Sequence, residues 1–570
     1  MSARVVFRGT ISEMEISELL KSLLAKRGVE SEDTIAAFLN PAYEAHLHDP
    51  MLLSGMQMAI ERFFVAFAKK ERIALYTDYD CDGIGGAVVL SDFLKKIGYE
   101  NWELYMPHRD REGYGFHAHA VEELAARGAS LIITADVGIT AVEAVDRARE
   151  LSVDVIITDH HEPMGAIPRA LAVVNPKLEE YPFPHLCGAA VAFKLVQALL
   201  TEGKRRNVPQ FLSIPDGWEK WLLDVVALAT ISDMVPLSGE NRTLVHFGLH
   251  VLRRSRRVGI RALCESARIQ QSIITEDDIG FGISPRINAA SRMDEPRIAF
   301  DLLTTHDRAQ AELLAQKLEA LNAQRKGIVA GIVKQAKKRA RERFTPEDTI
   351  AVLGDTAWKP SLLGLAANSL MQERGGVVCL WGRDAEGKLK GSCRSDDSIS
   401  LVDLFANTGD LFEHYGGHEH AGGFTVSHER VHLIQEELAR AGAMVSRSPS
   451  AEKIHFDASL PLSLISNALY SDVSRLSPFG MGNPKPIFLV PEVRVTDVKR
   501  FGKEKNHVEV MLECATTGRL VRSFDFFKGP EHFTHPPTVG VSAKVFATIE
   551  RDTYRGPSAL ALRLVDIVAI

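Results

Sequence analysis

The chain has 570 residues, of which 45% are hydrophobic and 25% are charged. This composition is ordinary for a soluble globular protein, and the length exceeds what one hydrophobic core supports, so we expect three or four domains. The formal net charge is −7, from 67 basic and 74 acidic residues. The overall charge therefore gives no sign of a nucleic-acid partner, and any basic surface must be local.

The cysteine pattern and the absence of targeting signals predict a cellular compartment. None of the six cysteines forms a CxxC pair, which argues against a disulfide framework and a zinc ribbon and favours a reducing environment. The first residues carry charges throughout and lack a signal-peptide core, and no apolar run approaches the length of a membrane span. We expect a cytoplasmic protein without a membrane association. The cysteines are Cys81, Cys187, Cys264, Cys379, Cys393 and Cys514.

The first two segments differ in the spacing of their apolar residues. Residues 1–70 contain short helical patterns interrupted at Asn40-Pro41 and Asp49-Pro50, and we expect this segment to pack on the core. Over residues 71–304, short β-rich apolar runs alternate with helical patterns. This alternation predicts right-handed βαβ units and a parallel sheet. The expected strands lie at 73–76, 102–106, 131–134, 153–158 and 171–174.

Three further segments complete the expected architecture. Residues 305–345 form a long helical pattern whose second half is basic, which fits either a solvated connecting helix or one that faces phosphates. A second α/β module follows at 346–448. Residues 449–570 contain about five short strand patterns, which suit a small barrel such as an OB-fold. The expected fold class is α/β, with two α/β domains joined by a long helix and a C-terminal β-barrel.

The most informative motif is the run of alternating carboxylates Asp78, Asp80 and Asp82, directly after an apolar strand pattern. Side chains two apart in an extended segment point the same way, and converging carboxylates repel one another unless a cation lies between them. An EF-hand calcium loop is one alternative, but its twelfth position is Val89 instead of Glu, and a strand precedes it where a helix is required. A solvated turn is the other alternative.

Further acidic groups follow other strands. One strand ends at Asp136, another ends at Asp159-His160-His161, and a later helix ends at Ser232-Asp233. The carboxyl ends of parallel strands share one edge of a sheet, where ligands bind. A single one of these histidines would more often be structural, but together with their neighbours they favour a metal site.

The ligand types indicate the metal and the chemistry. Carboxylates with one or two imidazoles suit Mn²⁺ or Mg²⁺ better than zinc. The carboxylates suffice for two ions, with Asp136 as the bridging ligand. Two such ions activate a water and stabilise the leaving oxygen of a phosphoryl displacement, so the residues predict phosphoester hydrolysis.

These motifs resemble the DHH phosphoesterase superfamily. The matching motifs are Asp78 to Gly83, Asp136, Asp159 to His161, and Ser232-Asp233, and Gly416-Gly417-His418 resembles the partner DHHA1 module. Finer matches resemble the RecJ family of single-strand-specific exonucleases. They are residues 107–109, EGYG at 112–115, PRINAA at 285–290, GSCRS at 391–395 and PFGMGNP at 478–484.

The resemblance implies a metal-dependent 5′→3′ exonuclease that hydrolyses single-stranded DNA to 5′-mononucleotides in DNA repair and recombination, with Mn²⁺ or Mg²⁺. It implies a monomer that works with a single-strand-binding protein and a helicase. The metal ligands would be Asp80, Asp82, Asp136, His160 and Asp233, with Asp78 as an outer ligand or a loop brace. Among the catalytic residues Asp136, Asp159 and His161, Asp159 would orient His160, and His161 would contact the scissile phosphate.

The same resemblance implies a set of substrate-binding residues. Arg109, Ser392 and Arg394 would form a 5′-phosphate pocket, and Arg286 and Arg292 would contact the DNA backbone. The alternative for each arginine is a surface ion pair. Asn288, Gly416, Gly417 and His418 complete the expected substrate-binding set.

We also expect the barrel to bind single strands through exposed rings, about half of its aromatic residues lying in its core. The rings are Phe501, His507, Phe524, Phe526, Phe527 and Tyr554, with Lys499, Arg500, Lys503, Lys505 and Arg522 near them.

The chain differs from the family's usual sequence motifs at Thr77, Ser291, Lys359 and Ser361. None of these positions is a proposed metal ligand, but Lys359 and Ser361 replace the usual His and Gly beside the substrate groove. Two alternative functions remain open. A DHH enzyme for short oligonucleotides, cyclic dinucleotides or pyrophosphate would usually end after the DHHA1 module. A non-catalytic DNA-binding replication scaffold would have lost carboxylates that this chain retains.

Overall fold

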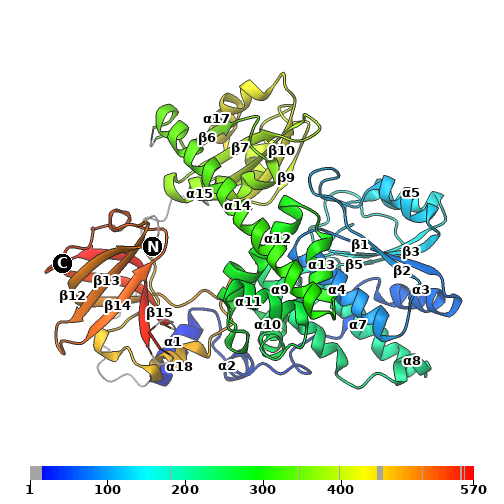
Figure 1. Ribbon diagram of the computed structural model, residues 1–570, viewed down its shortest axis with the longest axis horizontal. Helices are drawn as coiled ribbons and strands as arrows, with labels where there is room; N and C mark the ends of the chain where they lie inside the picture. Colours follow the sequence, from blue (N-terminus) through cyan, green and yellow to red (C-terminus); the bar gives the residue numbers. More distant parts are fainter. Residues whose placement is uncertain are drawn as a thin grey trace. The chain divides into compact units, whose positions relative to one another are not determined.

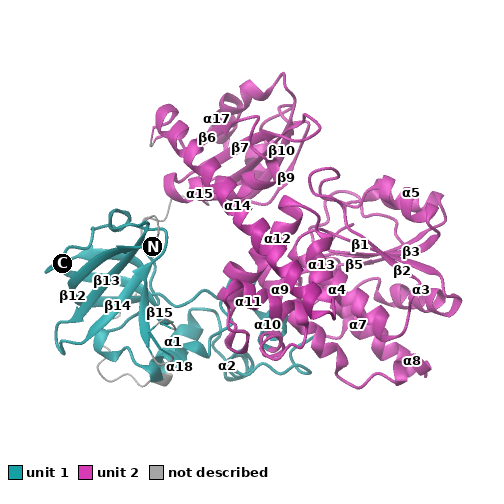
Figure 2. Cartoon of the chain, viewed as in Figure 1, with its two compact units in different colours: residues 1–47, 236–246, 452–570 teal, residues 48–235, 247–451 magenta. Residues whose placement is uncertain are grey.

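The computed structural model describes residues 16–179, 181–345, 347–396, 398–445, 454–502, 505–552, 555–556 and 559–570. The chain divides into two compact units (Figure 2). One unit comprises residues 48–235 and 247–451, and the other comprises residues up to 47, 236–246 and 452–570. Lys503 and Tyr554 of the expected DNA-binding face lie outside the described residues. No helix in the described ranges combines the length and the apolar character that crossing a membrane requires.

The larger unit contains a five-stranded sheet in which every pairing is parallel, as the sequence predicted. Its order is β2-β1-β3-β4-β5. The chain passes from β1 to β2 on one side and then returns to β3 on the other side of β1. The strand order therefore reverses at β1, and ligand sites form where such a reversal occurs. The strands are β1 (Arg72–Thr77), β2 (Trp102–Tyr105), β3 (Ala129–Ala135), β4 (Asp154–Thr158) and β5 (Ala172–Val174).

Helices cover this sheet and extend beyond it. Alternate strand residues such as Tyr76 and Ile132 face α5 and α6, where Val121 and Ala148 are fully buried. On the other side α4 packs against α7 and α9. The helices up to this point are α3 (Met56–Lys69), α4 (Cys81–Lys96), α5 (Ala118–Ala126), α6 (Val142–Glu150), α7 (Gly188–Arg205), α8 (Pro209–Leu212) and α9 (Leu223–Ser232).

The helix α14 (Arg308–Arg343) runs for 36 residues, as the sequence predicted (Figure 1). Its first half packs on α11, α12 and α13, and its second half packs on α15. Small residues such as Ala311, Ala315 and Ala336 are buried along it, which allows close helix contacts. The helices between α9 and α14 are α10 (Gly239–Leu252), α11 (Val258–Ala267), α12 (Ser284–Met293) and α13 (Arg297–Thr304).

A second sheet follows α14, with the order β6-β7-β8-β10-β9. Strands β6 and β7 are parallel, and the other pairings are antiparallel. The strands are β6 (Ile350–Gly354), β7 (Val377–Arg383), β8 (Leu389–Ser395), β9 (His414–Gly417) and β10 (Ala421–Val426). The helices are α15 (Pro360–Arg374), α16 (Leu401–Ala406) and α17 (Ile434–Met444).

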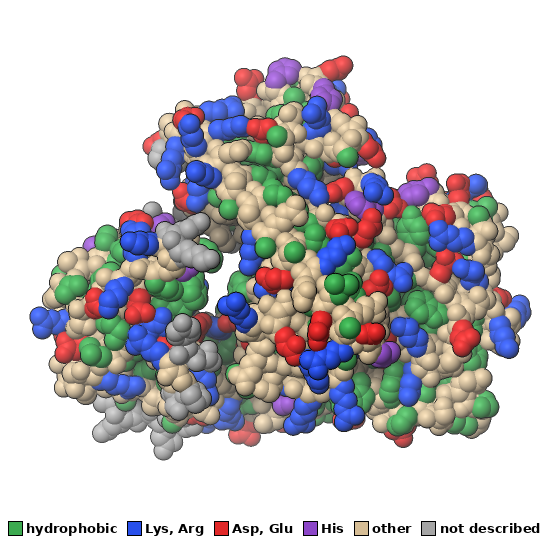
Figure 3. All heavy atoms as spheres, viewed as in Figure 1, with side chains coloured by type: hydrophobic (Ala, Val, Ile, Leu, Met, Phe, Trp, Pro, Cys, Tyr) green, Lys and Arg blue, Asp and Glu red, His purple; other side chains and the backbone are tan. Residues whose placement is uncertain are grey.

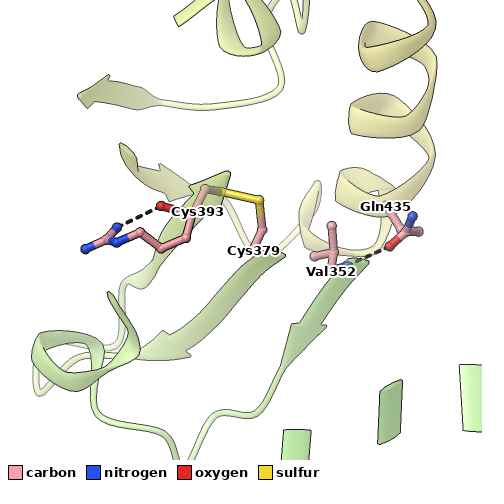
Figure 4. The surroundings of a disulfide bond; sticks show 5 residues. Val352, Cys379, Cys393 and Gln435 are labelled. Atoms are coloured by element: carbon pink, nitrogen blue, oxygen red, sulfur yellow. Dashed lines mark hydrogen bonds between the residues drawn. A yellow bond between two sulfur atoms is a disulfide. The ribbon is translucent and has the colours of Figure 1, made fainter. Parts of the chain in front are cut away.

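A disulfide joins Cys379 on β7 to Cys393 on β8 (Figure 4). The expectation that the cysteines stay reduced is therefore wrong for this pair. The 14-residue separation gave no motif, but the antiparallel register places the two residues directly opposite each other. The other four cysteines are free and buried. Beside the bond, the Val352 N–H donates to Gln435 Oε1 at 2.8 Å (Figure 4).

The smaller unit contains a closed five-stranded barrel, as expected for an OB-fold. The barrel order is β12-β13-β14-β16-β15, and a pairing between β12 and β15 closes it. The barrel strands are β12 (Phe488–Phe501), β13 (His507–Cys514), β14 (Leu520–Asp525), β15 (Ser542–Arg551) and β16 (Leu560–Ala569). The short strand β11 (Ala458–Ser459) and the helix α18 (Asn467–Ser474) precede them.

The expectation that residues 1–70 pack as one segment on the core needs a correction. Leu19, Leu23 and Leu24 of α1 (Ile16–Ala25) lie in the hydrophobic core of the barrel unit, whereas α3 packs on β5 and α7 of the larger unit. The cause is the leucine-rich face of α1, which completes a core that the barrel strands alone leave open. The helix α2 (Glu32–Leu39) follows α1.

Candidate metal centre

The loop after β1 is built to hold its carboxylates in place. Asp80 caps the N-terminus of α4, and its Oδ1 accepts hydrogen bonds from the Asp82 and Gly83 N–H groups at 2.8 and 3.2 Å. A Cβ at Gly83 would lie 2.3 Å from the Asp78 carbonyl oxygen, so only glycine permits this turn. Asn288, one of the expected substrate-binding residues, braces the loop, because its Oδ1 accepts from the Cys81 N–H at 2.8 Å.

Two further features shape the middle of the site. Asp136 has φ +64°, a left-handed conformation that is rare for residues other than glycine and is typical of functional sites. A Cβ at Gly188 would lie 2.4 Å from the Asp136 Cβ, so the start of α7 approaches Asp136 closely. There the Gly188 and Ala189 N–H groups donate to the two oxygens of Asp82 at 2.6 and 2.8 Å. The helix N-terminus thus favours the anionic form of Asp82.

The two histidines have different surroundings. His160 is buried, and its Nε2 lies 3.2 Å from Asp136 Oδ1, 3.6 Å from Asp233 Oδ2 and 3.7 Å from Asp82 Oδ2. Asp159 Oδ1 lies 2.8 Å from His161 Nδ1, so Asp159 orients His161. The expectation that Asp159 orients the His160 ring was wrong, because only the backbone N–H of His160 donates to this carboxylate.

Three groups of side chains could hold a metal ion, with the ligand atoms of each group within 4.8 Å of one another. Asp136 and His160 each belong to two of the groups, so the three groups adjoin one another. Among the described residues, Asp78 Oδ1, Asp136 Oδ1 and His160 Nε2 are buried without a hydrogen-bond partner. Buried polar atoms without a partner are costly, and a divalent cation would satisfy all three. The groups are Asp78, Asp80 and Asp136; Asp82, His160 and Asp233; and Asp136, His160 and His161.

The electrostatics of the cluster also fit a cation. Burial and the charge of Asp82 raise the pKa of Asp136 well above its usual value, and burial and Asp80 raise the pKa of Asp82 to about 6. Burial, followed by the charge of His161, lowers the pKa of His160 to about 3, so its ring is neutral and can act as a ligand. Burial opposes the charged form of His161, but Asp159 outweighs it and raises the pKa of His161.

The expected substrate-binding arginines fall into two classes. Arg109 lies over the Tyr79 ring at 4.8 Å, and Arg394 donates to the carbonyl of its neighbour Cys393. Within the described ranges, neither they nor Arg292 has a carboxylate partner. By contrast, Arg286 forms an ion pair with Glu319 at 2.5 Å. Among the described residues, Arg286 is therefore the one expected DNA-contacting arginine that forms an ion pair, and it does so in a largely buried position.

The other expected groove residues come from the second sheet. Ser392 and Arg394 lie on β8, and the Arg394 guanidinium rests against Gly364 of α15, where an added Cβ would lie 2.7 Å from it. Gly416 and Gly417 lie on the exposed strand β9. His418 follows them, and burial, together with the charge of His161, lowers its pKa. The two histidines are therefore close enough to influence each other.

The sequence motifs did not predict the individual roles of two residues in the loop at 107–115, Tyr114 and Glu112. The Tyr114 hydroxyl lies 3.1 Å from His161 Nδ1, so it shares this nitrogen with Asp159. Glu112 accepts from the Tyr105 hydroxyl at 2.6 Å and from the His108 N–H, which fixes the loop that carries Arg109. Both residues lie in the EGYG motif, which was quoted only for the family resemblance.

Family models match three segments of the chain. The DHH family N-terminal domain matches residues 72–230, the DHHA1 domain matches residues 347–443, and the RecJ OB domain matches residues 456–566. The single-stranded-DNA-specific exonuclease RecJ of Escherichia coli is 32% identical over 535 residues, which is 90% of this chain and 89% of the relative. The chain belongs to the RecJ family.

Other members of the RecJ family support this assignment. The Bacillus subtilis RecJ is 34% identical over 504 residues, and the match covers 88% of this chain but 62% of that longer relative. The crystal structure of the Thermus thermophilus RecJ in complex with Mn²⁺ superposes with a TM-score of 0.77 at 27% identity, covering 97% of this chain and 78% of that chain. A second structure of that protein contains Mg²⁺.

Proposed function

We propose that this RecJ family member is a metal-dependent 5′→3′ exonuclease that hydrolyses single-stranded DNA to 5′-mononucleotides, in DNA repair and recombination. The observation that carries the proposal is the convergence of six potential ligands on one edge of the parallel sheet. These residues are Asp78, Asp80, Asp82, Asp136, His160 and Asp233. The relatives named above are single-stranded-DNA-specific exonucleases, which supports the substrate class.

Two ions of Mn²⁺ or Mg²⁺ fit the donor set, with Asp136 as the shared ligand. Ions bound there would supply charge stabilisation for an in-line phosphoryl displacement and a nucleophilic water at neutral pH. His160 would be a neutral ligand, because burial lowers the pKa of its ring. Oxygen ligands with a single imidazole favour these ions over zinc.

The chain's own residues would position the scissile bond. His161, held by Asp159 and Tyr114, is placed to donate a hydrogen bond to a phosphate oxygen. Its raised pKa favours the charged form, which binds an anion better. Without metal, Asp136 and the carboxylates around it would repel the scissile phosphate itself, whereas the rest of the strand would bind to residues outside the carboxylate cluster.

The polarity of cleavage would come from a 5′-phosphate pocket. Arg109, Arg394 and Ser392 supply donors for one terminal phosphate, and the two arginines have no carboxylate partner among the described residues. A guanidinium that the protein leaves unpaired is available for a charge-assisted bond to phosphate. A strand that places its 5′-phosphate there would present its first phosphodiester to the metal centre.

The barrel would hold the rest of the strand. Phe526 and Phe527 are 40% and 78% exposed and surround His507, whereas Phe524 is buried. Arg563 lies over Phe526 at 4.6 Å. Exposed rings stack on bases without regard to sequence. Several barrel cations are ion-paired, which limits their electrostatic contribution. These pairs are Lys499 with Asp497, Arg500 with Glu531, and Arg522 with Glu509 and Asp552.

The closed barrel is the feature that argues against an enzyme for short oligonucleotides or cyclic dinucleotides, and the intact carboxylate cluster argues against a non-catalytic scaffold. We assign catalysis to residues 71–304, with the connecting helix at 305–345, the DHHA1 domain at 346–448 and the barrel domain at 449–570. The enzyme would act in the cytoplasm as a monomer, with a single-strand-binding protein and a helicase as partners. Digestion of an end-labelled strand with and without Mn²⁺ tests the proposal.

A further inference from the structure

A cluster of four basic side chains lies where α12 packs against α14. Arg286 and Arg292 lie on α12, and Arg325 and Lys326 lie on α14. These four residues are called the α12–α14 basic cluster below. The cluster joins the expected DNA-contacting arginines of α12 to a stretch of α14 that no motif identifies.

The protein supplies few partners for this charge. Arg286 pairs with Glu319, whereas the one hydrogen bond of the Arg292 guanidinium within the described residues goes to the Ser361 carbonyl, at 2.6 Å. Arg325 Nε is buried and makes no hydrogen bond within the described part of the chain. Asn322, one turn before Arg325 on α14, is 1% exposed, and both of its side-chain polar atoms also lack partners there. Lys326 is exposed and has no ion pair with any described residue.

The four cations also repel one another. Burial, and then the charges of Arg109 and Arg325, lower the pKa of Arg292 to about 9. Burial and the charge of Arg286 lower the pKa of both Arg325 and Lys326. Crowding partly buried cations is unfavourable for the protein alone, because each loses hydration and, among the described residues, only Arg286 of the four forms an ion pair. A bound anion would reverse both effects.

The position of the cluster indicates which anion it takes. Its member Arg292 is close enough to Arg109 and Asp80 for their charges to affect its pKa, so the cluster is continuous with the 5′-phosphate residues and the metal centre. The other end of the cluster lies on the exposed side of α14, at Lys326. A charged track from the surface to a phosphodiester-cleaving centre matches the repeating charge of a DNA backbone.

We propose that Arg325 and Lys326, together with Arg292, bind a non-terminal phosphate of the single strand. This inference rests on the proposed function and extends the substrate path onto the connecting helix. Arg325 would donate its unpaired Nε to the phosphate, and Lys326 would supply a second charge at the surface. Arg286 would keep its structural ion pair with Glu319.

Binding of a 5′-hydroxyl strand of about 20 nucleotides in EDTA, measured by fluorescence anisotropy over a range of salt concentrations, tests the inference without hydrolysis. The variant is Arg325→Gln, and Lys338→Gln is the matched control. Lys338 lies on the same helix, and its side chain is 79% exposed beside Glu342. Arg325→Gln should raise Kd about three- to ten-fold and reduce the salt slope by about 0.7, the loss of one phosphate contact. Lys338→Gln should change neither value.

Three further arms make the result decisive. Arg325→Lys keeps the charge and should therefore keep most of the salt slope. If the role of Arg325 were purely structural, Arg325→Lys would reduce the slope as Arg325→Gln does. If Arg325→Gln fails to fold, Lys326→Gln at the exposed position should give the same loss of slope. A 5′-mononucleotide carries only a terminal phosphate, so it should bind all variants alike. An equal effect on this mononucleotide would place Arg325 in the terminal pocket and contradict the inference.

Equal slopes for the wild-type protein, Arg325→Gln and Lys326→Gln would overturn the inference. A separate digestion with Mn²⁺ distinguishes this failure from a failure of the proposed function. Wild-type protein that binds the strand but does not cleave it would refute the exonuclease, while the slope comparison would still decide whether the cluster binds phosphate.

Discussion

Lys359 Nζ lies 2.8 Å from Asp110 Oδ2 and 2.7 Å from the Arg292 carbonyl oxygen, so one lysine before α15 ties two parts of the catalytic domain to the DHHA1 domain. Ser361 adds a bond from its Oγ to the same carbonyl at 3.3 Å. Lys359 and Ser361 are the two residues that differ from the family's usual His and Gly beside the substrate groove. In this chain they hold Arg292 and Asp110, which is adjacent to Arg109, in place.

Breaking this link should weaken substrate binding more than catalysis. The pair is partly exposed, so its loss should cost about 0.2–1 kcal/mol, which is up to about five-fold in KM for a 5′-phosphorylated strand with kcat unchanged. Asp110→Ala and Lys359→Ala should have similar effects, and the charge-swapped double variant should recover part of the loss. Lys388→Ala, at an exposed pair with Glu386, is the control. Additive losses in the double variant would show that the two residues do not act together.

Removing Arg394 should reduce the preference for a 5′-phosphate. The wild-type protein should degrade a 5′-phosphorylated strand faster than a 5′-hydroxyl one, because the two unpaired arginines bind the terminal phosphate. Arg394→Ala should lower the rate on the phosphorylated strand about ten-fold or more and leave the other rate nearly unchanged. Initial rates on the two strands measure this ratio. Equal rates on both strands in the wild-type protein would remove the pocket.

The metal-free protein should become less stable as pH rises. The pKa of Asp82 is raised from 3.8 to about 6, and that of Asp136 is also raised well above its usual value, because burial disfavours the charged forms. A carboxyl with a raised folded-state pKa stabilises the fold while it is protonated. This contribution is complete below 3.8 and is lost as pH rises through about 6 and above. Melting temperatures in EDTA should therefore fall between about pH 4 and about pH 8.

Two comparisons separate the metal centre from other titrating groups. Asp136→Asn removes one ionisable group and should show a smaller fall in melting temperature. Added Mn²⁺ should stabilise the wild-type protein more at about pH 8 than at about pH 5, because ligands must lose protons to bind metal. Identical curves for the wild-type protein and Asp136→Asn in EDTA would contradict the buried-carboxylate explanation.

An exposed ring on the barrel should contribute to binding of long strands. Phe527→Ala should raise Kd for a strand of about 30 nucleotides roughly ten-fold, because one stacked base is worth about 1–3 kcal/mol. Leu520→Ala is the control, since this exposed side chain lies on the same barrel but is not aromatic. Removing the whole barrel is a poorer test, because it would expose Leu23 and Leu24 of α1. An unchanged Kd for Phe527→Ala would indicate that this face binds something other than DNA.

The sequence predicted the sheet and its acidic edge because short-range patterns determine both. The apolar strand pattern before Asp78 and the glycine after Asp82 were enough to place the first three carboxylates at the end of β1. The expectation of an extended segment across them was wrong, because Asp80 caps α4 and Asp82 lies in the first turn of that helix. The sequence predicted the wrong histidine ring as the partner of Asp159, and it did not predict the bond between Asn288 and the Cys81 N–H. These contacts depend on ring orientation and, for Asn288, join residues 207 positions apart. The Cys379–Cys393 bond likewise depends on the register between β7 and β8, which the sequence does not show. The leucines of α1 do not indicate which hydrophobic core they complete.

The surface charge illustrates the same limit. Acidic and basic side chains are interspersed over the face shown in Figure 3, in agreement with the modest net charge. Composition therefore could not reveal that Arg109, Arg292 and Arg394 lack carboxylate partners among the described residues while Arg286 has one. That distinction comes from tertiary contacts alone.

Digestion of one single strand, labelled at its 5′ end or at its 3′ end, tests the central claim most directly. With Mn²⁺, the wild-type protein should release the 5′ label at once as a mononucleotide and the 3′ label only at the end of the reaction. EDTA should stop the reaction, and Asp136→Asn should lose at least about 99% of the activity while still binding DNA, because the shared ligand is gone. Early release of the 3′ label, or cleavage by Asp136→Asn at the wild-type rate, would contradict the account.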